Sequence, residues 1–229
     1  MDGFVHWAQQ LQFGKLIEML IIACSSLLCI TIHETSHGLA AHWLGDNTAK
    51  DAGRLTLNPL RHIDLMGLIM MVIAHFGWAK PVPVDMSRFE NPKIGMAMTS
   101  FAGPLSNVLL MIAASFLRVP FLFWYLNGEA EIFFYICVFL EYTMVLSAGL
   151  AVFNLFPFPP LDGSKVLFSL LPDAAYRKLM KYERYGMILL AIALFAGILD
   201  GPLFYLRDKL IELSYFLVNP LINFFIAMR

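Results

Sequence analysis

Long apolar runs, rather than an alternation of polar and apolar residues, dominate this chain. A helix needs about 20 apolar residues to cross the hydrocarbon core of a bilayer, and most of the runs reach or approach that length. The run at 185–199 is short enough to be a buried or re-entrant helix instead. The pattern predicts an all-α polytopic membrane protein with about five to six membrane helices, built from the runs at 16–32, 94–117, 132–156, 185–199 and 210–228.

The stretch between the first two runs has a different character. Residues 54–57 alternate polar and apolar side chains and end at Asn58-Pro59, which is typical of a short strand followed by a turn. Residues 65–76 are apolar but too short to span a bilayer. We therefore expect a small β-strand and re-entrant region between the first two spans.

Composition agrees with this class and limits the partners. Charged residues make up 14% of the chain, against about 25% in soluble domains. The net charge is −1, and no basic run indicates a nucleic-acid partner. Lys and Arg gather in the loops 46–93 and 157–184, and loops rich in these residues face the cytoplasm. We expect a multi-pass protein of the cell membrane (plasma or inner membrane), embedded in the lipid bilayer, with both long loops in the cytoplasm.

One motif in the first apolar helix carries chemistry. His33-Glu34-Thr35-Ser36-His37 has the H-E-x-x-H pattern, which places two imidazoles four residues apart on one face of a helix. In enzymes with this pattern both histidines bind zinc and the glutamate is the general base. The alternative is a solvated helix end, because an ionisable side chain at mid-membrane costs about 3 kcal/mol unless water or snorkelling relieves it.

A catalytic zinc site needs a third protein ligand and an open fourth position, and Asp162 is the candidate. It follows the proline-rich run 157–160, which prevents a regular helix and could aim one carboxylate at a metal. From spacing alone, Asp162 could equally be the N-cap of a helix that begins near Gly163.

Together these motifs resemble the site-2 protease family of intramembrane zinc metalloproteases, in its compact branch without a PDZ domain. The resemblance covers residues 30–170 approximately. It depends on several separate motifs in the expected order, which are His33–His37, Gly53–Pro59, His62–Asp64, Gly77–Val84, Gly103–Asn107 and Asn154–Gly163.

The resemblance implies a role for each matching residue. The ligands of one Zn²⁺ per chain would be His33, His37 and Asp162. Glu34 would take a proton from the attacking water and pass it to the leaving amine. Asn154 would stabilise the oxyanion of the tetrahedral intermediate, and Asn107 would support the metal-binding helix from a neighbouring helix. The implied substrates are transmembrane segments of other proteins, cut in or near the bilayer.

The extended segment 77–85 could supply what an unwound substrate needs. Pro81 and Pro83 place both missing N–H groups on one edge, and the other edge keeps the donors of Val82 and Val84. That edge could bind a substrate strand, or the segment could only cap the active-site loop.

We expect residues 1–229 to form a single membrane-embedded metalloprotease domain, with the shared core at about 16–170 and C-terminal helices at 185–228. Two other classes of function compete with the protease. An inactive relative that binds membrane proteins as a scaffold would lack Glu34 or a metal ligand, and none is lost. A transporter would show paired broken helices or inverted repeats, and the sequence shows neither.

Overall fold

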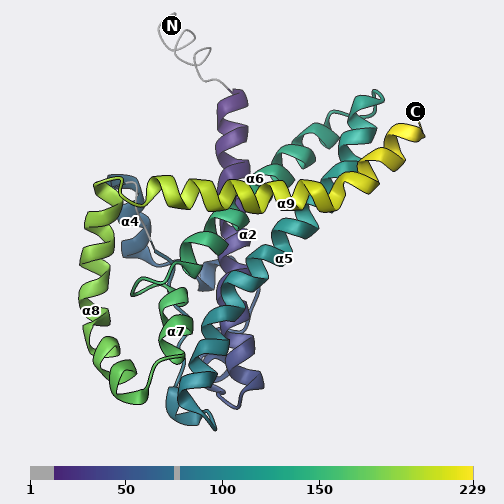
Figure 1. Ribbon diagram of the computed structural model, residues 1–229. Helices are drawn as coiled ribbons and strands as arrows, with labels where there is room; N and C mark the ends of the chain where they lie inside the picture. The colour runs from purple at the N-terminus through teal and green to yellow at the C-terminus, as the bar shows by residue number, and fades with distance from the viewer. Residues whose placement is uncertain (1–12, 75–77, 229) are drawn as a thin grey trace, which may run out of the picture.

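The computed structural model describes residues 13–74 and 78–228 of the chain. Residues 75–77, where the expected re-entrant stretch meets the extended segment, lie outside the described part. The helices follow one another as drawn in Figure 1, with η marking 3-10 helices, in the order α2 (Phe13–Trp43), α3 (Thr48–Asp51), η1 (Pro59–Arg61), α4 (Leu65–Ala74), η2 (Met86–Arg88), α5 (Pro92–Leu126), α6 (Ile132–Leu155), α7 (Asp162–Ser169), α8 (Asp173–Phe195) and α9 (Asp200–Ala227).

Within the described residues, four helices are long and apolar enough to cross a membrane, namely α2, α5, α6 and α9. The prediction of five to six membrane helices is therefore not confirmed. The apolar part of α8, Tyr185–Phe195, is a shorter helix than a span requires. Pro202 lies in the first turn of α9, where its missing N–H breaks no helical hydrogen bond. The last helix thus begins with Asp200-Gly201-Pro202.

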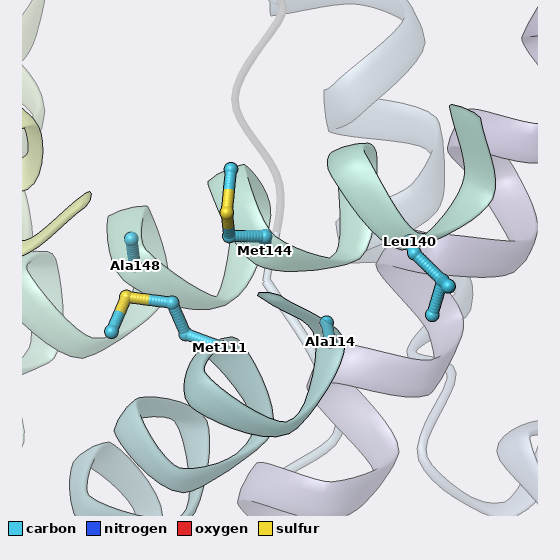
Figure 2. Packing of buried hydrophobic residues seen from close by; sticks show 5 residues of the cluster. All are labelled: Met111, Ala114, Leu140, Met144 and Ala148. Carbon is cyan, nitrogen blue, oxygen red and sulfur yellow. The ribbon is translucent and has the colours of Figure 1, made fainter. Parts of the chain in front are cut away.

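The centre of the fold is the packing of α5 against α6. Small alanines let helix backbones approach closely, and flexible methionines fill the space that remains. Helix α2 packs on the same pair, with Cys29 Sγ 3.1 Å from Ser147 Oγ at its contact with α6. Helix α9 also contacts α5 and α6, and crosses the view at a steep angle to α2 (Figure 1). The buried apolar cluster between α5 and α6 is shown in Figure 2 and consists of Met111, Ala114, Leu140, Met144 and Ala148.

Two acidic side chains on the long helices, those of Glu18 and Glu141, are paired across helix contacts. The carboxylate of Glu141 on α6 accepts a hydrogen bond of 2.6 Å from the guanidinium of Arg118 on α5. Glu18 on α2 accepts one of 2.5 Å from the hydroxyl of Tyr142 on α6. Because an unpaired ionisable group is costly inside a membrane, these pairs explain how apolar helices carry Glu18 and Glu141.

The expected strand at 54–57 is absent from the described residues, where one isolated antiparallel bridge joins Ile63 to Ala79. The reason is that side chains take the place of a partner strand. The carbonyl of Thr56 lies 3.0 Å from the hydroxyl of Thr35 on α2 and 2.9 Å from Nε2 of His62. The region is therefore a loop fastened to α2 by side chains, followed by α4, and not a small sheet.

Asp46 fastens the loop after α2 to the loop before α5. Its fully buried carboxylate accepts hydrogen bonds from the N–H of Thr48 at 2.9 Å, the hydroxyl of Thr48 at 2.5 Å and the N–H of Asp85 at 2.7 Å. Burial by itself raises the pKa of Asp46, but these hydrogen bonds outweigh it and lower the pKa below the ordinary value.

Candidate metal centre

Three side chains from two distant helices meet at one point. His33 and His37 lie one turn apart on α2, and Asp162 is the first residue of α7. Nε2 of His33 lies 3.0 Å from Nε2 of His37, and Oδ2 of Asp162 lies 3.3 Å and 3.2 Å from these two nitrogens. His33 is buried, and the other two are half-buried. Among the described residues, these three side chains form a group of possible metal ligands, and their three ligand atoms could hold a metal ion.

The backbone around Asp162 explains how its carboxylate reaches α2. The N-cap of α7 is Leu161, so the alternative that Asp162 caps the helix is wrong. A Cβ on Gly163 would lie 2.1 Å from the carbonyl oxygen of Leu155, so only glycine lets the start of α7 fold back against the end of α6. Burial opposes ionisation of Asp162, but its contacts with His33 and His37 outweigh burial and hold its pKa well below the usual range.

Helix α5 holds the rings of both histidines. Nδ1 of His37 donates a hydrogen bond to the carbonyl oxygen of Thr99 at 2.7 Å, which leaves Nε2 free to act as a ligand. The amide nitrogen of the fully buried Asn107 lies 3.1 Å from Nδ1 of His33. A Cβ on Gly103 would lie 2.4 Å from Nε2 of His37 and 2.8 Å from Cε1 of His33. Asn107 was expected beside the helix that carries His33 and His37, and it lies there. Thr99 was not expected, because a backbone carbonyl acceptor leaves no trace in residue type.

Asn107 carries a further sign of a metal site. Its Oδ1 is buried without a hydrogen-bond partner among the described residues. Turning the side-chain amide about its axis places Oδ1 against Nδ1 of His33, where it accepts the proton of that nitrogen. A His33 that carries its proton on Nδ1 presents a bare Nε2 to the other two ligand atoms, which is the tautomer a metal ligand requires.

The donor set fits zinc. Two imidazoles and one carboxylate form one of the usual ligand sets of catalytic zinc. Metal–ligand distances of about 2.0–2.1 Å place the ligand atoms of a tetrahedral site about 3.3 Å from one another. The three observed separations of 3.0, 3.2 and 3.3 Å match that spacing to within a few tenths of an ångström.

Glu34 lies one residue after the first histidine and is held from outside α2. Its Oε2 accepts a hydrogen bond of 3.0 Å from the backbone N–H of Val82. The donor edge of the extended segment thus faces α2 at Val82, and the N–H that was expected to bind a substrate strand is used inside the protein. Val84, on the same segment, is half-buried, and its contact with a substrate stays a prediction.

Asn154 is near the C-terminal end of α6, eight residues before Asp162 in the chain. Its side-chain amide donates a hydrogen bond of 3.0 Å to the carbonyl oxygen of Leu150, one turn earlier in the same helix. The structure therefore does not join Asn154 to the three-residue cluster through a hydrogen bond, and its role in chemistry stays a prediction.

Comparison with known proteins gives the family. The profile of peptidase family M50 matches residues 126–198, which include Asn154 and Asp162. A Bacillus subtilis (strain 168) protein named "Putative zinc metalloprotease YwhC" is 32% identical over 226 residues, or 97% of this chain and 100% of the relative. This chain belongs to peptidase family M50.

A second relative agrees with this assignment. The Mycolicibacterium smegmatis protein named "Putative zinc metalloprotease Rip2" is 28% identical, over 79% of this chain and 69% of the relative. No solved structure gives a significant match. As an M50 peptidase with four candidate membrane spans, the chain is a membrane zinc metalloprotease of the site-2 protease family.

Proposed function

We propose that this M50 peptidase hydrolyses peptide bonds in or near transmembrane segments of other membrane proteins. The observation that carries the proposal is the meeting of His33, His37 and Asp162 on a helix that is itself a candidate membrane span. A site on such a helix is reached by substrates that are themselves in the bilayer or at its surface. One Zn²⁺ per chain would be held by these three side chains.

Zinc bound at such a site makes water nucleophilic near neutral pH and polarises a carbonyl group. Glu34 takes the proton of the attacking water as its oxygen bonds to the peptide carbon. When the C–N bond breaks, Glu34 delivers that proton to the leaving nitrogen, so one carboxylate is first base and then acid. Glu34 follows His33 directly on α2, which supports a position close to the proposed ligands.

Two more residues complete the proposed site. Asn154 stabilises the oxyanion that forms at the peptide carbonyl, once its amide turns from the carbonyl of Leu150. Val84 presents a backbone N–H to an unwound substrate, which needs hydrogen-bond partners in place of its own helix. The site lies at the cytoplasmic side of the cell membrane in this proposal, because the basic loops 46–93 and 157–184 adjoin the helix ends that form it.

The test is cleavage of a model single-span membrane protein by the purified full-length chain in detergent, with bound zinc measured on the same samples. Wild type is compared with Glu34→Gln, which keeps the shape of the side chain but cannot accept the proton. We expect wild type to cleave and Glu34→Gln to lose at least about 100-fold in kcat, with about one zinc per chain in both.

Three outcomes would contradict parts of the proposal, one of them measured on a further variant, Asp162→Ala. Cleavage by Glu34→Gln at the wild-type rate would remove Glu34 as the base. Zinc that survives Asp162→Ala at wild-type affinity would remove Asp162 from the ligand set. A wild-type protein that binds zinc but cleaves none of a panel of single-span substrates would favour a scaffold over a protease.

A further inference from the structure

The contact between Val82 and Glu34 is unusual in kind, because a backbone amide from a separate loop holds the carboxylate of a helix residue. The N–H of Val82 donates to Oε2 of Glu34 at 3.0 Å. Oε1 of the same carboxylate has no hydrogen-bond partner among the described residues. The contact thus distinguishes the two oxygens, engaging one and leaving the other open.

The sequence around Val82 isolates this donor. Pro81 and Pro83 have no N–H, so Val82 carries the single backbone donor between Lys80 and Val84. Proline also restricts the backbone of its own residue and of the residue before it to extended conformations. The segment is therefore stiff, and its one central donor has a fixed direction.

Both ends of the segment are fastened to the rest of the protein. The N–H of Lys80 donates to the carbonyl of His62 at 2.9 Å, and the guanidinium of Arg54 donates to the carbonyl of Lys80 at 2.6 Å. At the other end, the N–H of Asp85 donates to the buried carboxylate of Asp46 at 2.7 Å.

The middle of the segment is fixed by packing against α2. The side chain of Val82 is buried, and a Cβ on Gly38 would lie 3.1 Å from its Cγ1. Gly38 is one helical turn after Glu34, so the absence of a side chain there lets Val82 sit directly beside the carboxylate. Three separate anchors thus set the position of one N–H relative to Glu34.

We propose that Val82 is a positioning residue, whose backbone N–H holds Glu34 so that Oε1 faces the reacting water. The inference deepens the proposed function, because it rests on Glu34 being the base. A glutamate side chain has several rotatable bonds, and a charge-assisted hydrogen bond to one oxygen removes most of that freedom. Small errors in the placement of a base lower the reaction rate by large factors. Loss of the contact between Val82 and Glu34 is therefore expected to lower kcat.

The test removes the N–H without removing the segment. Val82→Pro removes the backbone N–H at this position. The fold is expected to tolerate it because the backbone there is already extended and flanked by Pro81 and Pro83. We expect kcat to fall about 10–100-fold, with KM and bound zinc near wild-type values. Val82→Ala keeps the N–H and loses only packing, so its loss of kcat is much smaller than that of Val82→Pro. A fall in kcat that is equal for both variants would overturn the proposal.

Ser87→Pro is the matched control. It removes a backbone N–H that donates to another carboxylate, Asp85, at the same distance of 3.0 Å in the same loop. The carboxylate of Asp85 is separate from the N–H by which Asp85 anchors the segment, and it is not part of the metal-binding cluster. The fall in kcat is therefore expected to be much smaller than that of Val82→Pro.

A second variant covers the case in which Val82→Pro does not fold. The α-hydroxy acid analogue of valine, placed at position 82 by nonsense suppression, replaces the N–H by an ester oxygen and keeps the side chain. We expect the same loss of kcat with zinc retained; full kcat in the ester variant overturns the positioning role. Failure of the proposed function is distinguishable, because wild type would then not cleave, or Glu34→Gln would cleave as well as wild type.

Discussion

Gly103 on α5 lies so close to His37 on α2 that a Cβ at position 103 would be 2.4 Å from Nε2 of that histidine. The same Cβ would be 2.8 Å from Cε1 of His33. Real Cβ atoms do not approach other atoms this closely, so a side chain at position 103 must displace both rings. Gly103 is therefore part of the candidate metal centre although it has no ligand atom.

The first prediction concerns this glycine. Gly103→Ala is expected to lower zinc affinity at least as much as loss of a residue that orients a ligand, about 10–100-fold, because both imidazoles must move. The measurement is zinc content after dialysis against buffers of defined free zinc. Gly149→Ala is the control, since a Cβ there meets nothing within 4 Å among the described residues. Equal zinc affinity in the two variants would contradict the prediction.

The second prediction concerns the partner of His33. Asn107→Leu removes the side chain that fixes the ring through Nδ1, and zinc affinity should fall about 10–100-fold with the helix still formed. Competition with a chelator of known affinity measures the change. Ser115→Ala, on the same helix, removes a buried hydroxyl bonded only to the carbonyl of Met111 and should leave zinc affinity unchanged. An effect of Ser115→Ala as large as that of Asn107→Leu would indicate general disruption of α5 instead.

The third prediction concerns pH. Because the pKa of Asp46 is lowered in the folded protein, its ionised form stabilises the fold above the ordinary aspartate pKa of 3.8. That contribution is lost as the pH falls through the lower, folded value. Asp46→Asn should cost about 1–3 kcal/mol at pH 7, and the difference from wild type should shrink below pH 4. Thermal unfolding of wild type and Asp46→Asn in detergent, at pH 7 and at a pH below 4, measures this difference in stability.

Asp51→Asn is the control for this measurement, because Asp51 is an exposed carboxylate a few residues away. It should match wild type in thermal stability at both pH values. A difference between wild type and Asp46→Asn that stays constant with pH would show that the carboxylate's charge contributes nothing.

The fourth prediction concerns Arg118 and Glu141, whose side chains are 24% and 47% exposed. A double-mutant cycle with Arg118→Met and Glu141→Leu should give a coupling of about 0.5–1 kcal/mol in stability. Zinc affinity should not change, because this pair joins α5 to α6 away from the metal-binding cluster. Additive single effects would show that the two charges are not coupled.

The grouping of the three proposed metal ligands could be predicted from the sequence better than the architecture could. The motif at His33–His37 and the family resemblance named Asp162, and the structure brings these three side chains within ligand distance of one another. The support from Thr99 was out of reach, because a backbone carbonyl carries no pattern of residue type. Gly103 belongs to the family motif Gly103–Asn107, but its closeness to the two histidine rings could not be predicted from the sequence. Thr99, Gly103 and Asn107 are four residues apart and so lie on one face of α5. That spacing indicates a contact with the histidines only when the helix facing α5 is known.

The error at 54–57 has a physical cause. Alternation of polar and apolar residues predicted a strand, but the carbonyl of Thr56 is satisfied by the side chains of Thr35 and His62. The alternation is present in the sequence, but a strand also needs a partner strand, and here side chains take its place.

Thr99, Gly103 and Asn107 form a straight line along α5, one helical turn apart, and this line meets His33 and His37 on α2. Turning α5 by one residue would swing all three away by about 100°, and sliding it by one turn would press Thr99 or Asn107 where only glycine fits. The register of α2 against α5 therefore decides whether the proposed ligands stay together. We expect any opening that admits a substrate to come from other parts of the molecule while this register is kept.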